Sequence, residues 1–364
     1  MITMFKSNIL WKGFLVVVAA LLLVYLNNGL LNIQNDTTVY VSQIQYFDGD
    51  QGKNIQSHSF KPFYGFVGSL LTPLLTTHQA ILIINVVLYI GLIFASFFLL
   101  RSFGISEAYS LVGASWVAFA YPVLKYGLAL LTDVSGWFFA VATCYIFMKF
   151  VKSKNINLLY AVSVVGFLGS LCKETGTLGL IFSGVCLFFM FIEKNEWIYL
   201  KYITALVTPF FILQGILYFL TTRSGGKTFL DWFLYNVNTN TSEKFHSLNY
   251  FIPVEIATFN ILWIYFLIGL YALYKSRDNR GYIFVALFIA TLPALLWPLF
   301  YIRILFIQML FVLPVSVYGL LFMVNKTNRL WLKVTFIALP IITSVFLFVL
   351  ANGRSLFDVL RVNL

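Results

Sequence analysis

The stretch Ala80-Ile-Leu-Ile-Ile-Asn-Val-Val-Leu-Tyr-Ile-Gly-Leu-Ile-Phe-Ala-Ser-Phe-Phe-Leu-Leu100 decides the fold class of this chain. It contains no charged side chain, and as a helix it is long enough to cross about 30 Å of hydrocarbon. Similar apolar stretches recur from one end of the sequence to the other. Because a backbone in lipid must satisfy its own hydrogen bonds, these stretches predict an all-α bundle of membrane-spanning helices.

The composition supports this class along the whole chain. Of 364 residues, 60% are hydrophobic and only 10% are charged, with 39 Phe and 21 Tyr. Globular domains contain about 25% charged residues, so an ordinary soluble protein is excluded. We therefore expect one transmembrane domain over residues 1–364, without a soluble domain. It should have about eleven spans (ten to twelve), at Ile9–Leu31, Ala80–Leu100, Ala108–Leu124, Thr132–Phe150, Leu158–Cys172, Thr175–Ile192, Ile198–Thr221, Pro253–Tyr274, Gly281–Phe300, Ile304–Val324 and Leu330–Leu350.

The distribution of charges predicts the orientation. With the N-terminus inside, basic residues fall at nearly every inner turn, as the positive-inside rule requires, for example Lys152, Lys194, Lys275 and Lys326. Most acidic residues then lie outside. The net charge of +11 is explained mainly by topology, so we expect contacts with membrane lipids and no nucleic-acid partner. The predicted location is a bacterial cytoplasmic membrane, as a multi-pass protein.

Two long loops lie on the predicted outer face, residues 32–77 and 222–252. In the first loop, Tyr40 follows Asp36 by one helical turn, and Tyr64 opens a second amphipathic stretch, Phe63 to Leu75. We therefore expect short interfacial helices in this loop. In the second loop, the aromatic segment Phe229 to Tyr235 is predicted to lie flat at the interface.

Charged residues of the outer face are the candidate functional residues, since charges near a membrane bundle often mark a site. They are Asp36, Lys61, Asp133, the pair Lys173-Glu174, and Arg303. Each alone has an ordinary structural explanation, such as a helix cap, an interfacial anchor or a favourable helix dipole. Their joint occurrence on one side favours a single polar site.

The cysteines and histidines give no defined metal or disulfide site. Cys144, Cys172 and Cys186 lie in or at the ends of spans without ligand spacing, which is typical of small buried residues. His58, His78 and His246 are scattered over outer segments. A divalent metal cofactor therefore stays an open alternative, and the sequence assigns it no ligands.

Glycines are concentrated in the predicted fifth and sixth spans, at Gly166, Gly169, Gly176, Gly179 and Gly184. Small residues at helical spacing allow helix backbones in membranes to approach closely. The pattern predicts tight packing between these two spans.

The order of the charged motifs resembles the GT-C superfamily of integral-membrane glycosyltransferases, which includes protein O-mannosyltransferases and lipid A aminoarabinose transferases. The resemblance rests on Asp36 in the first outer loop, on Lys61-Pro62, and on Thr132-Asp133. It also rests on Leu171-Cys172-Lys173-Glu174-Thr175 and on Tyr301-Ile302-Arg303-Ile304-Leu305-Phe306, which precedes a span containing Pro314. These motifs run from about Asp36 to Gly319.

The resemblance implies specific roles. The first-loop carboxylate would make Asp36 the catalytic residue, and the family's Lys-Pro-Pro lysine would place Lys61 near the donor phosphate. The sequence departs from the family in having Thr37 where relatives often carry a second acid, and Phe63 after Lys61-Pro62. It also lacks the soluble C-terminal domain of several relatives.

Glycosyl transfer needs the chemistry that these residues offer. Asp36 can accept a proton from an acceptor hydroxyl, while Lys61, Arg303 and Lys173 can bind a donor phosphate. Tyr40, Tyr64, Asp133 and Glu174 are expected to line the site. Because nucleotide sugars are cytoplasmic, an outer-face site favours a polyprenyl-phosphate sugar donor.

We therefore expect an inverting glycosyltransferase that acts on a lipid, glycan or protein acceptor at the outer face. Two alternatives stay open, namely an oligosaccharide-repeat polymerase and a membrane transporter or lipid-linked-sugar flippase. A transporter should carry charges near the middle of its spans, and this sequence has almost none there.

Overall fold

The computed structural model describes residues 2–28, 31–34, 36–50, 52, 59–223, 228, 231, 234, 238, 251–276, 281–296 and 301–351, with the side chains of 2–10, 27–28 and 296 left aside. Every regular element in these ranges is helical, which confirms the all-α prediction for this part of the chain. The elements are α1 (Ile2–Asn28), α2 (Thr37–Phe47), α3 (Phe63–Ser69), α4 (Thr77–Ser102), α5 (Glu107–Ala118), α6 (Tyr121–Tyr126), α7 (Asp133–Ser153), α8 (Asn157–Cys172), η1 (Glu174–Thr177), α9 (Leu178–Lys194), α10 (Ile198–Arg223), α13 (Phe251–Phe259), α14 (Leu262–Ser276), α15 (Gly281–Thr291), η2 (Leu292–Leu296), α16 (Ile302–Leu305), η3 (Phe306–Gln308), α17 (Met309–Lys326) and α18 (Leu330–Leu350).

Long apolar helices make this an integral membrane protein. Within the described residues, 6 helices are long and apolar enough to cross a membrane, or up to 7 if the bent pair α13–α14 forms one span. Shorter apolar helices occupy Trp11–Leu26, Asn157–Cys172 and Gly281–Leu295. Each predicted span coincides with one or more helices, but several are broken, so the count of about eleven spans stays a prediction.

The break between α13 and α14 turns the chain by 83° at Asn260. Asn260 has a left-handed backbone (φ 42°), which asparagine tolerates better than most residues. Its side chain donates to Ser344 Oγ at 2.8 Å and accepts from Thr343 Oγ1 at 3.0 Å, both on α18. The bend is therefore fixed by α18.

The glycines of the fifth and sixth predicted spans bring α8, η1 and α9 together. A Cβ atom added at Gly169 would lie 2.8 Å from the carbonyl oxygen of Gly176, and one at Gly176 would lie 2.7 Å from the backbone of Gly169. Such distances leave no room for a side chain. By contrast, a Cβ added at Gly184 meets nothing within 4 Å. The predicted close packing is confirmed at Gly169 and Gly176, while Gly184 takes no part in it.

A second close contact joins α14 to α17. A Cβ at Gly269 would lie 1.9 Å from the carbonyl oxygen of Val315, and one at Gly319 would lie 2.0 Å from that of Tyr265. The two helices therefore touch backbone to backbone.

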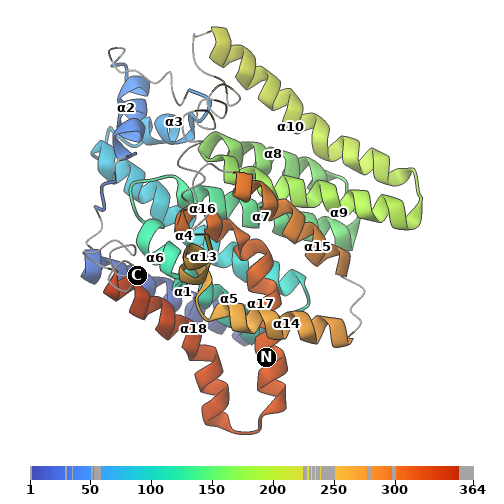
Figure 1. The fold of residues 1–364 in the computed structure, drawn as a ribbon. Coiled ribbons are helices and arrows are strands. Elements are labelled where there is room, and N and C mark those ends of the chain that lie inside the picture. The colour runs from blue at the N-terminus through green and yellow to red at the C-terminus, as the bar shows by residue number, and fades with distance from the viewer. Residues whose placement is uncertain are drawn as a thin grey trace.

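The first predicted outer loop contains both expected short helices. They are α2 and α3, which lie next to one another at the upper left of Figure 1. The second helix ends at Ser69 and is shorter than the predicted stretch to Leu75. Most of loop 222–252, including the predicted interfacial segment Phe229 to Tyr235, falls outside the described residues.

Candidate active site

Asp36 stands immediately before α2. As the residue preceding the first helical turn it could cap the helix, but its side chain makes no capping hydrogen bond. Instead, its carboxylate faces Arg303 Nη2, with Oδ2 at 3.2 Å. The Asp36 side chain is 53% exposed, which leaves part of the carboxylate open to a ligand.

The segment between α6 and α7 is clamped from two sides. From α4, Asn85 Nδ2 donates to the carbonyl oxygens of Ala129 at 2.6 Å and Leu131 at 3.0 Å. From α2, Thr37 Oγ1 donates to the carbonyl oxygen of Leu130 at 3.0 Å. Because these bonds satisfy buried backbone groups, they fix the position from which α7 starts.

Asp133 is the first residue of α7, where the helix dipole favours a negative charge. Its side chain is only 1% exposed, and two cations surround it. Lys173 Nζ donates to Oδ1, and Arg303 Nη1 donates to Oδ2 at 3.4 Å. A buried carboxylate would be costly without such partners.

Lys173 and Glu174 lie at the turn from α8 into η1. Lys173 has an extended backbone that ends α8, and Glu174 begins the 3-10 turn. The two side chains bind different partners, since Lys173 pairs with Asp133 while Glu174 Oε2 lies 2.5 Å from Lys61 Nζ. The Gly169–Gly176 contact holds this turn against α8.

Lys61 lies just ahead of α3, and it is a buried residue rather than an interfacial anchor. Its side chain is only 6% exposed. Burial is the main cause that lowers the pKa of Lys61, and the carboxylate of Glu174 opposes this shift. The ion pair with Glu174 keeps an ammonium group stable at a site that would otherwise disfavour it.

Arg303 belongs to the short helix α16, directly before η3 and α17. Its guanidinium joins two carboxylates, because Nη2 faces Asp36 and Nη1 faces Asp133. Its carbonyl oxygen accepts a hydrogen bond from Trp137 Nε1 of α7 at 3.2 Å. This bond ties α16 to the helix that carries Asp133.

Two neighbouring sets of ion pairs are here called the charged network, made of Asp36, Lys61, Asp133, Lys173, Glu174 and Arg303. Contacts link Asp36, Arg303, Asp133 and Lys173 in one set, and Lys61 and Glu174 form the other. The charges of Lys173 and Asp133 also act on Lys61, so the two sets lie close together. All six residues come from distant parts of the sequence, and their three carboxylates balance their three cations when all are ionised.

Tyr40 and Tyr64 are buried close to the charged network, since the charge of Asp133 acts on both phenols. The hydroxyl groups of Tyr40 and Thr132 are hydrogen-bonded at 3.0 Å, and Tyr64 donates to Asn85 Oδ1 at 2.6 Å. Burial is the main cause that raises the pKa of both phenols above the ordinary value. The two rings lie 5.8 Å apart and form part of the packed surroundings of the site.

Sequence reasoning missed Lys125 of α6. Its ammonium group lies over the rings of Tyr121 and Tyr126 and 3.2 Å from Tyr121 Oη. Burial lowers the pKa of Lys125. Burial raises the pKa of Tyr126, and the charges of Arg303 and Asp133 also act on it. Helix α6 therefore borders the site. The available signal was a basic residue on the predicted outer side, where basic residues are in the minority.

The charged network does not fit a divalent metal as it is arranged. The carboxylates of Asp133 and Glu174 are turned toward Lys173, Arg303 and Lys61. The described residues contain no group of three His, Cys, Asp or Glu side chains that could hold a metal ion. His58 and His246 fall outside the described residues.

Comparison with known proteins gives a match in fold. An oligosaccharyltransferase from Archaeoglobus fulgidus, solved in complex with Zn and sulfate, matches with a TM-score of 0.60 and 15% sequence identity, over 93% of this chain and 53% of that chain. Its apo form matches with a TM-score of 0.62 and 14% identity, over 96% of this chain and 57% of that chain. The chain is similar in fold to this oligosaccharyltransferase.

The likeness covers nearly all of this chain but only about half the length of the archaeal protein. At 14–15% identity the comparison shows a likeness of fold alone. No protein-family model matches the sequence, and no curated protein matches it either.

Proposed function

We propose that this protein is a GT-C-type membrane glycosyltransferase, which moves a sugar from a polyprenyl-phosphate donor to an acceptor hydroxyl on the outer face, with inversion. The observation that carries the proposal is the charged network. It places a half-exposed carboxylate, Asp36, beside a guanidinium, Arg303, at 3.2 Å. The oligosaccharyltransferase-like fold supports the same reaction class.

Arg303 is the proposed phosphate-binding residue. Its planar group can bind a phosphate oxygen on one side while it keeps a carboxylate on the other, as it now holds two carboxylates. The donor phosphate replaces Asp36 at Nη2, while Asp133 stays at Nη1. Replacing the more exposed partner costs less than removing the buried Asp133, which also binds Lys173.

Asp36 is the proposed general base. Once phosphate occupies Arg303, the Asp36 carboxylate is free to accept the proton of the acceptor hydroxyl. The acceptor oxygen forms a bond to the anomeric carbon as the bond from that carbon to the phosphate oxygen breaks, and the electron pair leaves on the phosphate. Arg303 stabilises the charge that develops there. In this scheme, binding of the donor phosphate to Arg303 is also the step that releases Asp36 to act as the base.

The other members of the charged network are proposed to position the site. Lys173 holds Asp133, and Asp133 orients Arg303. Lys61 and Glu174 form a second pair at the edge of the network, where Lys61 can attract the phosphate. No step is assigned to a metal, since the three carboxylates of the charged network are each paired with a cation.

The test is incubation of the purified protein in lipid vesicles with a panel of labelled polyprenyl-phosphate sugars, with identification of the labelled product. The Asp36→Asn variant should lose transfer by about 10²–10⁴-fold while donor binding is kept, because asparagine keeps the shape but cannot accept a proton.

The matched control is Asp48→Asn. Asp48 is an exposed carboxylate at the end of α2, bonded to Thr72, and its replacement should leave turnover within a factor of two. Retention of more than about half of the wild-type turnover by Asp36→Asn would show that Asp36 is not the base.

A further inference from the structure

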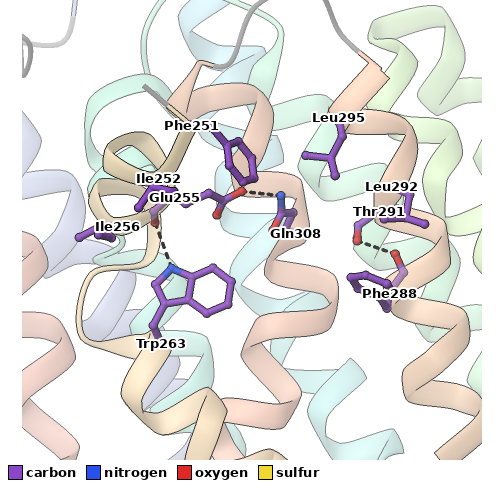
Figure 2. Close-up of a pocket in the computed structure, with 10 residues that line it drawn as sticks. All are labelled: Phe251, Ile252, Glu255, Ile256, Trp263, Phe288, Thr291, Leu292, Leu295 and Gln308. Carbon is purple, nitrogen blue, oxygen red and sulfur yellow. Dashed lines mark hydrogen bonds between the residues drawn. The ribbon is translucent and has the colours of Figure 1, made fainter. Parts of the chain in front are cut away.

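A separate cavity of about 350 Å³ lies where α13, α14, α15, η2 and η3 meet. None of the six residues of the charged network lines it. Figure 2 shows Phe251, Glu255 and Gln308 together on one side of this space, with Phe288, Thr291 and Leu292 across from them. The volume falls in the range of small-molecule sites, and the lining is mostly apolar and aromatic.

Glu255 is the unusual residue in this lining, because it is a carboxylate that is only 7% exposed. Its Oε1 accepts a hydrogen bond from Gln308 Nε2 at 2.6 Å, while its backbone oxygen accepts one from Trp263 Nε1 at 3.1 Å. Its Oε2 is buried and has no hydrogen-bond partner among the described residues. An unpartnered carboxyl oxygen at a membrane cavity indicates a missing ligand group.

The residues that line the cavity indicate the charge of the missing ligand group. None of the described residues around the cavity is basic, so a phosphate or carboxylate would meet only the like charge of Glu255. A cation would instead form an ion pair with Glu255. Phe251, Trp263 and Phe288 add aromatic rings, whose faces attract ammonium groups.

An adjoining apolar cavity indicates that the rest of the ligand is an aliphatic chain. A second cavity of about 540 Å³ continues along α15 and is lined by Leu270, Phe284 and Phe311 among others. Phe288 lines both cavities, and its ring lies 5.4 Å from that of Phe311. Apolar cavities therefore adjoin one another at Phe288, from Glu255 along α14 and α15.

We propose that the Glu255 cavity binds an amphiphile whose alkylammonium group pairs with Glu255 and whose aliphatic chain follows α15. This site goes beyond the proposed sugar transfer and does not depend on it. The polyprenyl-phosphate donor is a poor fit for this site, because none of the described lining residues is a cation that could hold the phosphate.

The test uses three photoreactive diazirine probes of equal chain length, namely a dodecylammonium, a dodecanol and a dodecanoate. Each is added to the full-length protein in phosphatidylcholine vesicles, and labelled residues are located by mass spectrometry. Labelling of Phe251 to Leu295 is normalised to that of Phe211 and Phe219, which are exposed on α10 and report general contact with the bilayer. The ammonium probe should label the cavity at least tenfold more than either other probe.

Two variants and one control decide the assignment. Glu255→Gln keeps the size of the side chain and should reduce ammonium labelling at least tenfold. Leu295→Trp fills the cavity and should block labelling while Glu255 is retained. Glu193→Gln makes the same change at an exposed site at the end of α9 and should have no effect. Equal labelling by the three probes, or unchanged labelling in Glu255→Gln, would overturn the proposal and leave Glu255 as a protonated packing residue.

Discussion

Arg303 is central to the charged network, because its guanidinium faces two of the network's carboxylates, Asp36 and Asp133. A lysine can supply a positive charge at this position. It cannot direct two parallel N–H groups at Asp36 and Asp133, or at two phosphate oxygens. The residue can therefore be tested by a substitution that conserves charge.

Arg303→Lys should weaken donor binding by about 1–2 kcal/mol, or roughly 5- to 30-fold, because one charge-assisted hydrogen bond is lost. The measurement is equilibrium binding of labelled donor in vesicles. Arg329→Lys is the matched control, since Arg329 is exposed before α18, in the turn that follows α17. Wild-type affinity in Arg303→Lys would make Arg303 a membrane anchor and leave the phosphate to Lys61 and Lys173.

Tyr40 and Tyr64 predict how stability depends on alkaline pH. A tyrosine in the unfolded chain ionises near pH 10, whereas burial raises the pKa of both phenols in the folded protein. Above about pH 10 the folded state therefore binds more protons than the unfolded state, and stability falls as the pH rises. Tyr40→Phe should reduce this fall by up to about 1.4 kcal/mol per pH unit.

This effect is measured as the difference in unfolding free energy between pH 9 and pH 11 in detergent. Lys61 changes stability in the opposite sense below its ordinary pKa, because its lowered pKa leaves the folded state with fewer protons. It is present in both proteins, so its contribution cancels in the comparison. Tyr274→Phe serves as the exposed control. Identical slopes for Tyr40→Phe and wild type would show that Tyr40 is not buried as described.

At the residue scale, the charged residues that pair in the structure could be singled out from the sequence, but their pairing could not. Asp36, Lys61, Asp133, Lys173 and Arg303 stood out because charges are rare in this sequence and these five gather on one side. Which cation meets which carboxylate depends on how α2, α7, α8 and α16 pack, and short motifs carry no such information. Glu255 could not be singled out from the sequence, because its hydrogen-bond partner Gln308 is remote in the chain.

At the scale of elements, the turn from α8 through η1 to α9 contains both a close backbone contact and two residues of the charged network. Gly176→Ala should destabilise the protein by about 1–3 kcal/mol, because the added methyl group meets the backbone of Gly169 and cannot be relieved by a side-chain movement. It should also reduce transfer, since Lys173 and Glu174 occupy the same turn.

Gly184→Ala makes the same chemical change within α9, where nothing lies within 4 Å. It should be neutral or stabilise by up to about 1 kcal/mol, because alanine favours the helix. Thermal unfolding in detergent compares the two variants. Equal effects would contradict the close contact between Gly169 and Gly176.

Helix positions were predictable from hydropathy alone, whereas helix breaks were not. Ala80–Leu100 lies within α4 because a long apolar run has no other stable form in lipid. The predicted span Pro253–Tyr274 is instead divided into α13 and α14 at Asn260. That break depends on Thr343 and Ser344, which lie on another helix. The sequence around Asn260 therefore does not indicate it.

At the scale of the whole molecule, the predicted orientation can be tested by labelling. In a background with Cys144, Cys172 and Cys186 replaced by alanine, single cysteines are introduced at Asp48, Asn155 and Asn328, which are exposed turn or helix-end positions. An impermeant thiol reagent on intact cells should label position 48 only. Detergent-permeabilised cells provide the control for reactivity at all three positions. Labelling at 155 and 328 alone would invert the topology and place the charged network inside.

Gly269 and Gly319 let α14 and α17 pack so closely that the two helices should behave as one rigid unit. Their carbonyl contacts leave no layer of side chains that could slide or repack between the two helices. Each helix also continues from a segment with a polar group, since α14 follows the bend from α13 with Glu255, and α17 follows α16 with Arg303. We therefore expect α14 and α17 to move together, so that a displacement of α14 would reach the segment that carries Arg303.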